Sequence, residues 1–165
     1  MRFKHWAAAS LSVAMMTMAH ADIGKKDQDF LKQAAAGGMF EVEAGKAAQQ
    51  KGKSEGVKSF GAILEKDHSA ANEELKGLAQ RKGVSLPTEL PADKKSQLEK
   101  INQANDFDKQ FIEIVGVDAH KKDIELFEKA SQGAEDADVK AFATKTLPVL
   151  KSHREHAEEL KKTAQ

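Results

Sequence analysis

The sequence contains no cysteine, and this absence excludes several kinds of site at once. Disulfide bonds, thiolate metal ligands and cysteine nucleophiles are all ruled out, so any bound metal must be held by nitrogen and oxygen atoms. Proline is also scarce, with three in 165 residues, while charged residues make up 32% of the chain. This composition favours helices with solvated faces that are held together by packing.

Neither sign of charge is in excess, because 26 basic residues face 26 acidic ones. A chain without net positive charge lacks the basic surface that nucleic acid requires, so we expect no nucleic-acid partner. The sequence indicates no particular protein partner, and a homodimer is left open.

Long apolar runs are absent apart from residues 6–18, which are too few to favour a permanent membrane span. Arg2 and Lys4 precede this run and Ala19-His20-Ala21 follow it, which is the pattern of a secretory signal peptide. We therefore predict a signal peptide at residues 1–21, cleaved after Ala21, and one domain at residues 22–165 in the periplasm, with no integral membrane span. An uncleaved anchor is the alternative. Cleavage leaves 24 basic and 26 acidic side chains, a net charge of −2.

Apolar residues recur at three- and four-residue steps in four long stretches, which is the spacing of one face of a helix. We expect helices at residues 26–50 and 55–82, a third that begins at an N-cap near residue 105 or 106, and a fourth with apolar positions from residue 139 to 160. Pro148 is expected to kink or open the fourth helix. The central connection is long and includes a short helix at residues 92–103. This predicts an all-α, ferritin-like four-helix bundle of two hairpins joined by a long crossover.

Each long stretch carries one metal-capable residue on its apolar face: Glu41, His68, His120 and His153. A buried imidazole or carboxylate must be paired, neutralised or coordinated, because burial otherwise leaves it desolvated. Folding the first hairpin around residue 52 or 53 places Glu41 about one helical turn, ~6 Å, from His68. Folding the second around residues 134 and 135 gives the same offset between His120 and His153. All four can therefore meet in one layer near the middle of the bundle.

Three imidazoles and one carboxylate suit one transition metal ion per chain, and iron, manganese, zinc and copper all remain open. Glu65 and His68 have the Glu-x-x-His spacing of di-iron bundles, but Leu150 occupies the position of the second glutamate, so a mononuclear or asymmetric site is favoured. Other nearby side chains are candidates for orienting the ligands or replacing one of them; they are Glu43, Glu65, Asp67, Asp118, Asp123 and His156.

Several segments are also similar to one known family, namely residues 37–46, 67–72, 83–87, and 145–148 with His153. They resemble exported bacterial proteins that carry domain of unknown function 4142, are often labelled outer membrane proteins, and are grouped with ferritin-like folds. The resemblance implies export and a ferritin-like fold over nearly the whole mature chain. It also implies an acid before the histidine of the second and third helices. Asp67 fits this pattern, whereas Ala119 departs from it.

The function that these observations favour is transition-metal binding by a periplasmic helical bundle, in metal handling or stress protection. An enzyme is less favoured, because the sequence has no phosphate-binding loop and no nucleophile elbow. Two alternatives stay open. One is a non-catalytic structural or interaction protein of the cell envelope whose buried histidines form a hydrogen-bond network. The other is a metal-dependent oxidase.

Overall fold

The computed structural model describes residues 23–163, and the regular structure of this part of the chain is entirely helical. The predicted signal peptide and its cleavage after Ala21 lie outside the described residues. The elements are α1 (Lys25–Lys51), α2 (Glu55–Arg81), α3 (Ala92–Asn102), α4 (Phe107–Phe111), the π-helix η1 (Ile112–Ala119), α5 (His120–Gly133) and α6 (Ala137–Thr163). The first two predicted helices and the short one are confirmed to within one residue at each end.

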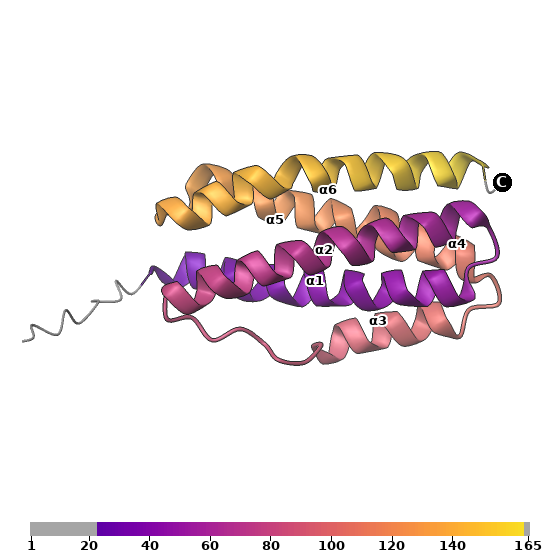
Figure 1. Cartoon of the computed structure of the whole chain (residues 1–165), viewed down its shortest axis with the longest axis horizontal. Coiled ribbons are helices and arrows are strands. Elements are labelled where there is room, and N and C mark those ends of the chain that lie inside the picture. Colours follow the sequence, from indigo (N-terminus) through magenta and orange to yellow (C-terminus); the bar gives the residue numbers. More distant parts are fainter. Residues whose placement is uncertain (1–22, 164–165) are drawn as a thin grey trace, which may run out of the picture.

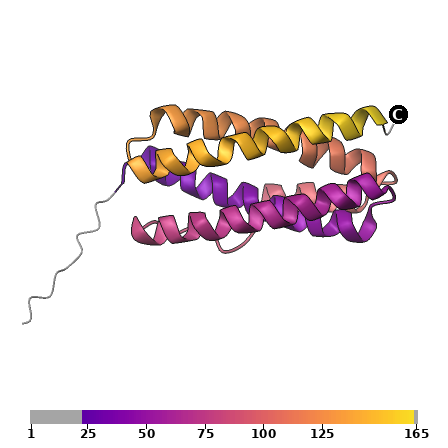
Figure 2. The same ribbon diagram turned by 45° about the horizontal axis from the view of Figure 1, so that its top comes forward.

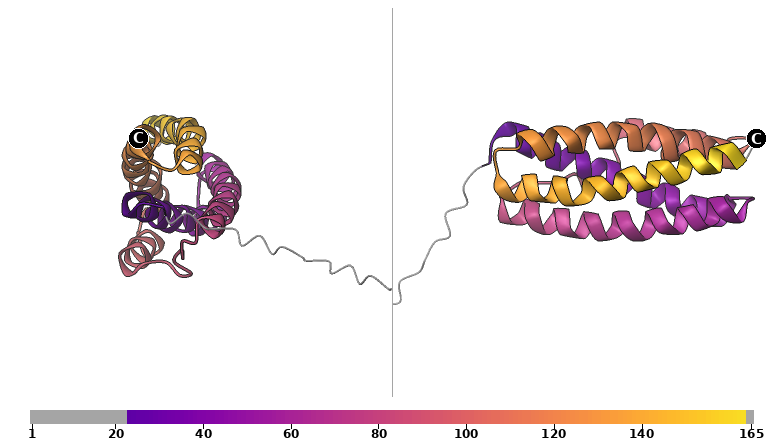
Figure 3. Two further views of the ribbon diagram at one scale, coloured as in Figure 1. Left: turned by 90° about the vertical axis from the view of Figure 1, so that its left-hand side faces the viewer. Right: turned by 90° about the horizontal axis from the view of Figure 1, so that it is seen from above.

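Two antiparallel hairpins build the molecule. The first consists of α1 and α2, and the second pairs α6 with a helical rod made of α4, η1 and α5 in succession (Figure 1). The two hairpins run beside each other along the length of the molecule (Figure 2). In the end-on view, four rods surround a common centre and α3 lies outside them against α1 (Figure 3). The all-α fold with a long crossover and a short helix is thus confirmed, while the ferritin-like assignment stays a prediction.

Each hairpin turn is held by a carboxylate from the other hairpin. Asp27 of α1 is buried and accepts hydrogen bonds of 3.0 and 2.8 Å from two backbone N–H groups in the turn between α5 and α6. Asp108 of α4 accepts hydrogen bonds of 2.9 and 2.8 Å from two backbone N–H groups in the turn between α1 and α2. These bonds satisfy donors that the turns leave without a helical partner. They also fix the axial register of the two hairpins.

Two apolar clusters fill the bundle, with a polar layer between them. One cluster contains Phe30, Phe127 and Phe142, and the other contains Phe60 and Phe111. On α2, α5 and α6 the sequence passes from one cluster to the other across a buried histidine or aspartate. The core is therefore interrupted at one level, where polar side chains from all four rods meet.

The third rod departs from the predicted helical stripe. Three- and four-residue steps from Phe111 to His120 predict that Ile114 and Val117 lie on the buried face, but both are only partly buried, and Val115 and Gly116 take the core positions instead. In this rod buried pairs recur every four residues, at 111/112, 115/116, 119/120 and 123/124. A step of four exceeds the 3.6 residues of an α-helical turn, and the wider turns of the π-helix accommodate it.

The kink or local opening expected at Pro148 in the fourth helix stays a prediction. Pro148 lies inside α6, and the helix continues through it to Thr163. Pro148 is exposed, as is Thr144, whose carbonyl loses its helical donor. Because water can reach that carbonyl, the proline does not end the helix. Among residues 23–163, none of the helices combines the length and the hydropathy needed to cross a membrane.

The first hairpin contains a close backbone contact that predicts a stability difference. A Cβ on Gly45 would lie 2.6 Å from the carbonyl oxygen of Gly61, and a Cβ on Gly61 would lie 2.7 Å from that of Gly45. We expect Gly45→Ala to lower the free energy of unfolding by about 1–3 kcal/mol, because α1 and α2 must move apart. Gly77→Ala on α2 is the control, since its Cβ meets only the end of Arg81, at 3.6 Å, and should stabilise by up to about 1 kcal/mol. Urea unfolding measures both; equal effects would contradict the close contact.

Candidate metal centre

The four residues singled out by the sequence pattern come together in the buried layer. The exposed fractions are 1% for Glu41, 6% for His68, 0% for His120 and 4% for His153. The ring centroids of the three histidines lie 5.3 to 5.5 Å apart in each pair. One ring nitrogen from each histidine lies within 4.8 Å of those of the other two. Three helical rods thus contribute one imidazole each to a common centre, and α1 adds the carboxylate.

The π-helix orients His120. Its ring Nδ1 lies 2.8 Å from the carbonyl oxygen of Val115, five residues earlier, which is the reach of a π-helical turn. A carbonyl can only accept, so Nδ1 carries the hydrogen and the Nε2 of the neutral ring carries a lone pair. Gly116 is buried in the same π-helix and lets α6 approach closely, because a Cβ there would lie 2.5 Å from the Cβ of Ala157.

His153 is oriented by a carboxylate from the other hairpin. Its Nε2 lies 3.1 Å from Oδ2 of Asp67, which comes from α2. The carboxylate accepts, so Nε2 carries the hydrogen and Nδ1 carries the lone pair. That Nδ1 lies 3.3 Å from Nε2 of His120. Two nitrogen lone pairs therefore face each other in the core, and only a proton or a cation placed at them turns this contact into an attraction.

Glu41 lies between the rings of His68 and His120. Its Oε2 is 3.0 Å from Nδ1 of His68, and its Oε1 is 3.3 Å from Nδ1 of His120. When Glu41 is ionised it can only accept, and this form places the hydrogen of His68 on Nδ1. The Nε2 of His68 is buried without a hydrogen-bond partner. Each of the three rings thus has one nitrogen directed at an oxygen and a second nitrogen with a free lone pair, the arrangement found around metal-binding histidines.

Burial sets the charge state of the layer. It lowers the pKa of His68, with a further lowering by the neighbouring His120 and His153, and it lowers the pKa of His120 from 6.5 to about 4. The pKa of His153 is lowered by burial as well, against the opposing effect of Asp67. Neutral imidazoles are the form that binds metal ions. A proton shared between two rings is disfavoured near neutral pH, whereas a metal ion needs these lone pairs.

A second buried carboxylate stands behind Glu41. Burial raises the pKa of Glu41 and the nearby negative charge of Asp123 raises it further; burial raises the pKa of Asp123 too. Gly37 makes room for this aspartate, since a Cβ there would lie 3.1 Å from its Oδ1. Sequence reasoning offered Asp123 as an orienting group for a histidine, and the structure instead places it against Glu41.

The remaining sequence candidates lie away from the three rings. Glu43 and Asp118 are exposed, and Glu43 pairs with Lys46 at 2.8 Å. Glu65 accepts a hydrogen bond from the side chain of Gln49 rather than from a histidine. The ring of His156 packs on that of Phe60, with centroids 4.9 Å apart. Of the nearby acids, only Asp67 and Asp123 belong to the buried network.

Two contributors were not anticipated from the sequence. The carbonyl of Val115 is one, because side-chain patterns say nothing about where a backbone oxygen points. Phe60 is the other: it is fully buried, and its ring centroid lies 6.5 Å from that of His120 and 6.3 Å from that of His153. It closes the layer on the side of the second apolar cluster. Its place on the apolar face of α2, two turns before His68, is the sequence signal that could have identified it.

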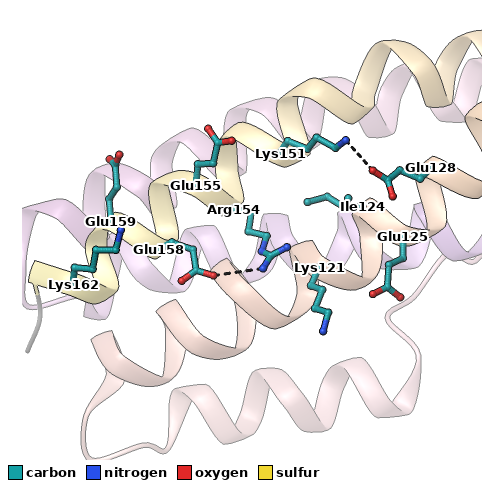
Figure 4. Close-up of a pocket in the computed structure, with 10 residues that line it drawn as sticks. All are labelled: Lys121, Ile124, Glu125, Glu128, Lys151, Arg154, Glu155, Glu158, Glu159 and Lys162. Atoms are coloured by element: carbon teal, nitrogen blue, oxygen red, sulfur yellow. Dashed lines mark ion pairs between the residues drawn. The ribbon is translucent and has the colours of Figure 1, made fainter.

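A groove between α5 and α6 is a different feature of the described surface. It measures about 670 Å³, and Figure 4 shows that its walls carry interspersed acidic and basic side chains. Two ion pairs lie along it, Lys151 with Glu128 at 2.8 Å and Arg154 with Glu158 at 3.6 Å (Figure 4). None of the three histidines lines it. Its charges largely compensate one another, and it offers no constellation comparable to the buried layer.

Comparison with known proteins agrees with this architecture. The family described as "Domain of unknown function (DUF4142)" matches residues 12–160. None of the curated proteins compared matches the chain. A DUF305 fragment from Deinococcus radiodurans has a similar structure, with a TM-score of 0.76 and 8% identity over 87% of this chain and 99% of that one. CopM in its Cu(I)-bound form is also similar, with a TM-score of 0.71 and 14% identity over 83% of this chain and 96% of that one. Its Cu(II)-bound form has a TM-score of 0.69 and 13% identity over 84% of this chain and 97% of that one. At these identities the likeness establishes the fold alone.

The lowered pKa of His120 predicts a pH-dependent stability in metal-free protein. The unfolded chain takes up a proton near pH 6.5 and the folded one only near pH 4, so stability that is present above pH 6.5 is lost as the pH falls toward 4. We expect this loss to reach roughly 3 kcal/mol. It is measured as the difference between wild type and His120→Gln in urea unfolding with chelator from pH 7 to pH 4. Glu41 and Asp123 are present in both proteins, so their contribution largely cancels; parallel curves would contradict the prediction.

Proposed function

The chain belongs to the DUF4142 family, whose description names no activity, and we propose from the geometry of its site that it binds one transition metal ion through His68, His120 and His153. The observation that carries this proposal is the contact of 3.3 Å between Nε2 of His120 and Nδ1 of His153. Without a cation the two lone pairs repel each other, and with a cation between them both become ligands. The unpartnered Nε2 of His68 supplies the third nitrogen.

The donor set favours Cu(II) first and Zn(II) second. Three imidazoles with no sulfur atom lack the soft ligands that select Cu(I), and for a given nitrogen site affinity rises along the first-row divalent ions to a maximum at copper. The copper-bound forms of CopM have a similar fold, which makes copper the first ion to test. Iron and manganese, which the sequence left open, prefer more oxygen ligands than the three rings provide.

Glu41 has an orienting role in this proposal rather than the role of a ligand. Its two oxygens approach the Nδ1 atoms of His68 and His120, while the lone pairs that would bind the ion are on the Nε2 atoms. Asp67 does the same for His153, and Val115 for His120. Such oxygen partners fix the ring orientation and raise the basicity of the coordinating nitrogen.

In the cell we place this activity in the periplasm, in the handling or sequestration of a metal ion. The predicted export signal at residues 1–21 and the balanced charge of the predicted mature domain support this location. The site is deeply buried, which suits storage or protection from side reactions better than rapid turnover. A metal-dependent oxidase would need room for a substrate beside the ion.

The proposal predicts stoichiometric metal binding by the three histidines. Protein purified without a His tag, stripped with chelator and titrated with Cu²⁺ is expected to take up one equivalent. At a hundredfold excess over Kd the folded state gains about 2.7 kcal/mol, so the melting temperature should rise by several degrees. His68→Ala, His120→Ala and His153→Ala should each abolish the rise, and His156→Ala should keep it. Less than ~0.1 equivalent of copper or zinc with no change in melting temperature would overturn the proposal in favour of a metal-free histidine network.

The role of Glu41 is tested separately. We expect Glu41→Gln to weaken copper affinity about 10- to 100-fold while one equivalent still binds, because the rings lose an orienting carboxylate but keep their nitrogens. Glu43→Gln on the exposed face of the same helix is the matched control and should leave affinity unchanged. Competition titration with a chelator of known affinity gives both values. Complete loss of binding in Glu41→Gln would instead make Glu41 a ligand.

A further inference from the structure

The buried layer is sealed on most sides. His120 is fully buried, and Phe60 covers the layer toward the second apolar cluster. On the side of α1, a cavity of about 20 Å³ is lined by Glu41, His68 and Asp123 among others. That space suffices for one water molecule, which needs roughly 10–15 Å³ by the same kind of measure. A hydrated ion cannot pass there.

One groove reaches the histidines from outside. It lies between α2 and α6, measures about 260 Å³, and has both His68 and His153 in its lining. A hydrated divalent ion with about six waters, each with a share of roughly 30 Å³, needs on the order of 180 Å³. The volume of the groove therefore suffices for such an ion beside two of the three rings. Its other walls come from Ala70, Ala71, Thr146, Val149 and Leu150.

The charges of the groove favour a cation. Asp67 lines the groove, with 37% of its side chain exposed and its Oδ2 3.1 Å from Nε2 of His153. Glu74 of α2 and Lys145 of α6 face each other across the groove and pair at 2.7 Å. The charges of Glu74 and Lys145 compensate each other, so the negative charge of Asp67 remains to attract an approaching ion. Asp67 is thus both accessible from the groove and in contact with a ring of the site.

We infer that the groove between α2 and α6 is the route by which the metal ion enters and leaves the site, with Asp67 as its first protein contact. This inference rests on the proposed function, and it adds the path and the residue that passes the ion to His153. An ion held by Asp67 lies next to the ring whose Nε2 the same carboxylate orients. The pair of Glu74 and Lys145 spans the groove and so hinders the approach of a cation.

Loading rates test the route independently of affinity. Stripped protein is mixed with Cu²⁺ in a stopped-flow instrument, and the appearance of the copper absorption is followed; equilibrium affinity is measured on the same variants. Val149→Trp and Ala70→Trp fill the groove from α6 and α2, and both positions are exposed, so the core is untouched. We expect each to slow loading and release by about tenfold or more with little change in Kd. Ala141→Trp, exposed on α6 away from the groove, is the control.

Variants of two charged residues of the groove should change the loading rate in opposite directions. Asp67→Asn should slow loading roughly three- to tenfold and reduce its dependence on salt, because the attracting charge is lost. Lys145→Gln should speed loading, because the ion pair across the groove is removed and the carboxylate of Glu74 is left to attract the cation. Unaltered rates in both tryptophan variants would overturn the route while leaving metal binding intact. A wild-type protein that takes up no copper would overturn the proposed function and the route with it.

Discussion

The arrangement of this protein depends on a contact that is unfavourable by itself, between Nε2 of His120 and Nδ1 of His153. A backbone carbonyl fixes the hydrogen of one ring and a carboxylate fixes that of the other, so two lone pairs remain 3.3 Å apart. Both rings are buried, which disfavours the proton that could join them. This contact lowers the stability of the metal-free fold. A cation that binds both lone pairs, as the proposed function requires, would turn it into a stabilising interaction.

The rest of the bundle holds this contact in place. Asp27 and Asp108 each accept hydrogen bonds from a turn of the opposite hairpin, so the two hairpins cannot slide past each other without breaking these bonds. Gly45 and Gly61 bring α1 against α2, and this sets the distance between Glu41 and His68. The π-helix turns His120 toward its carbonyl partner. Each device acts on the backbone, so the rings are placed by rigid elements rather than by mobile loops.

The sequence was sufficient to predict the helices, the two hairpins and the meeting of Glu41 with the three histidines. Those predictions depend on periodicity and on the lengths of connections, which local sequence largely determines. The π-helix could not be predicted this way, because Ile114 and Val117 fit an α-helical stripe as well as their neighbours do. The pairing of Asp67 with His153 rather than with the adjacent His68 could not be predicted either. It depends on the rotation of α2 relative to α6, which only tertiary packing sets.

The three carboxylates around the layer suggest how a divalent charge can be tolerated in the core. Glu41, Asp67 and Asp123 approach the layer from α1, α2 and α5, and the first two contact the nitrogens that face away from the common centre. In their ionised form they place negative charge one imidazole away from the proposed ion, where it would compensate the ion's charge without becoming a direct ligand. The imidazoles would remain neutral and transmit the interaction through their N–H groups. Since His68 and Asp67 come from the first hairpin, and His120 and His153 from the second, an ion bound at the centre would also join the two hairpins. The proposed metal binding would therefore be coupled to the packing of the bundle by the same side chains.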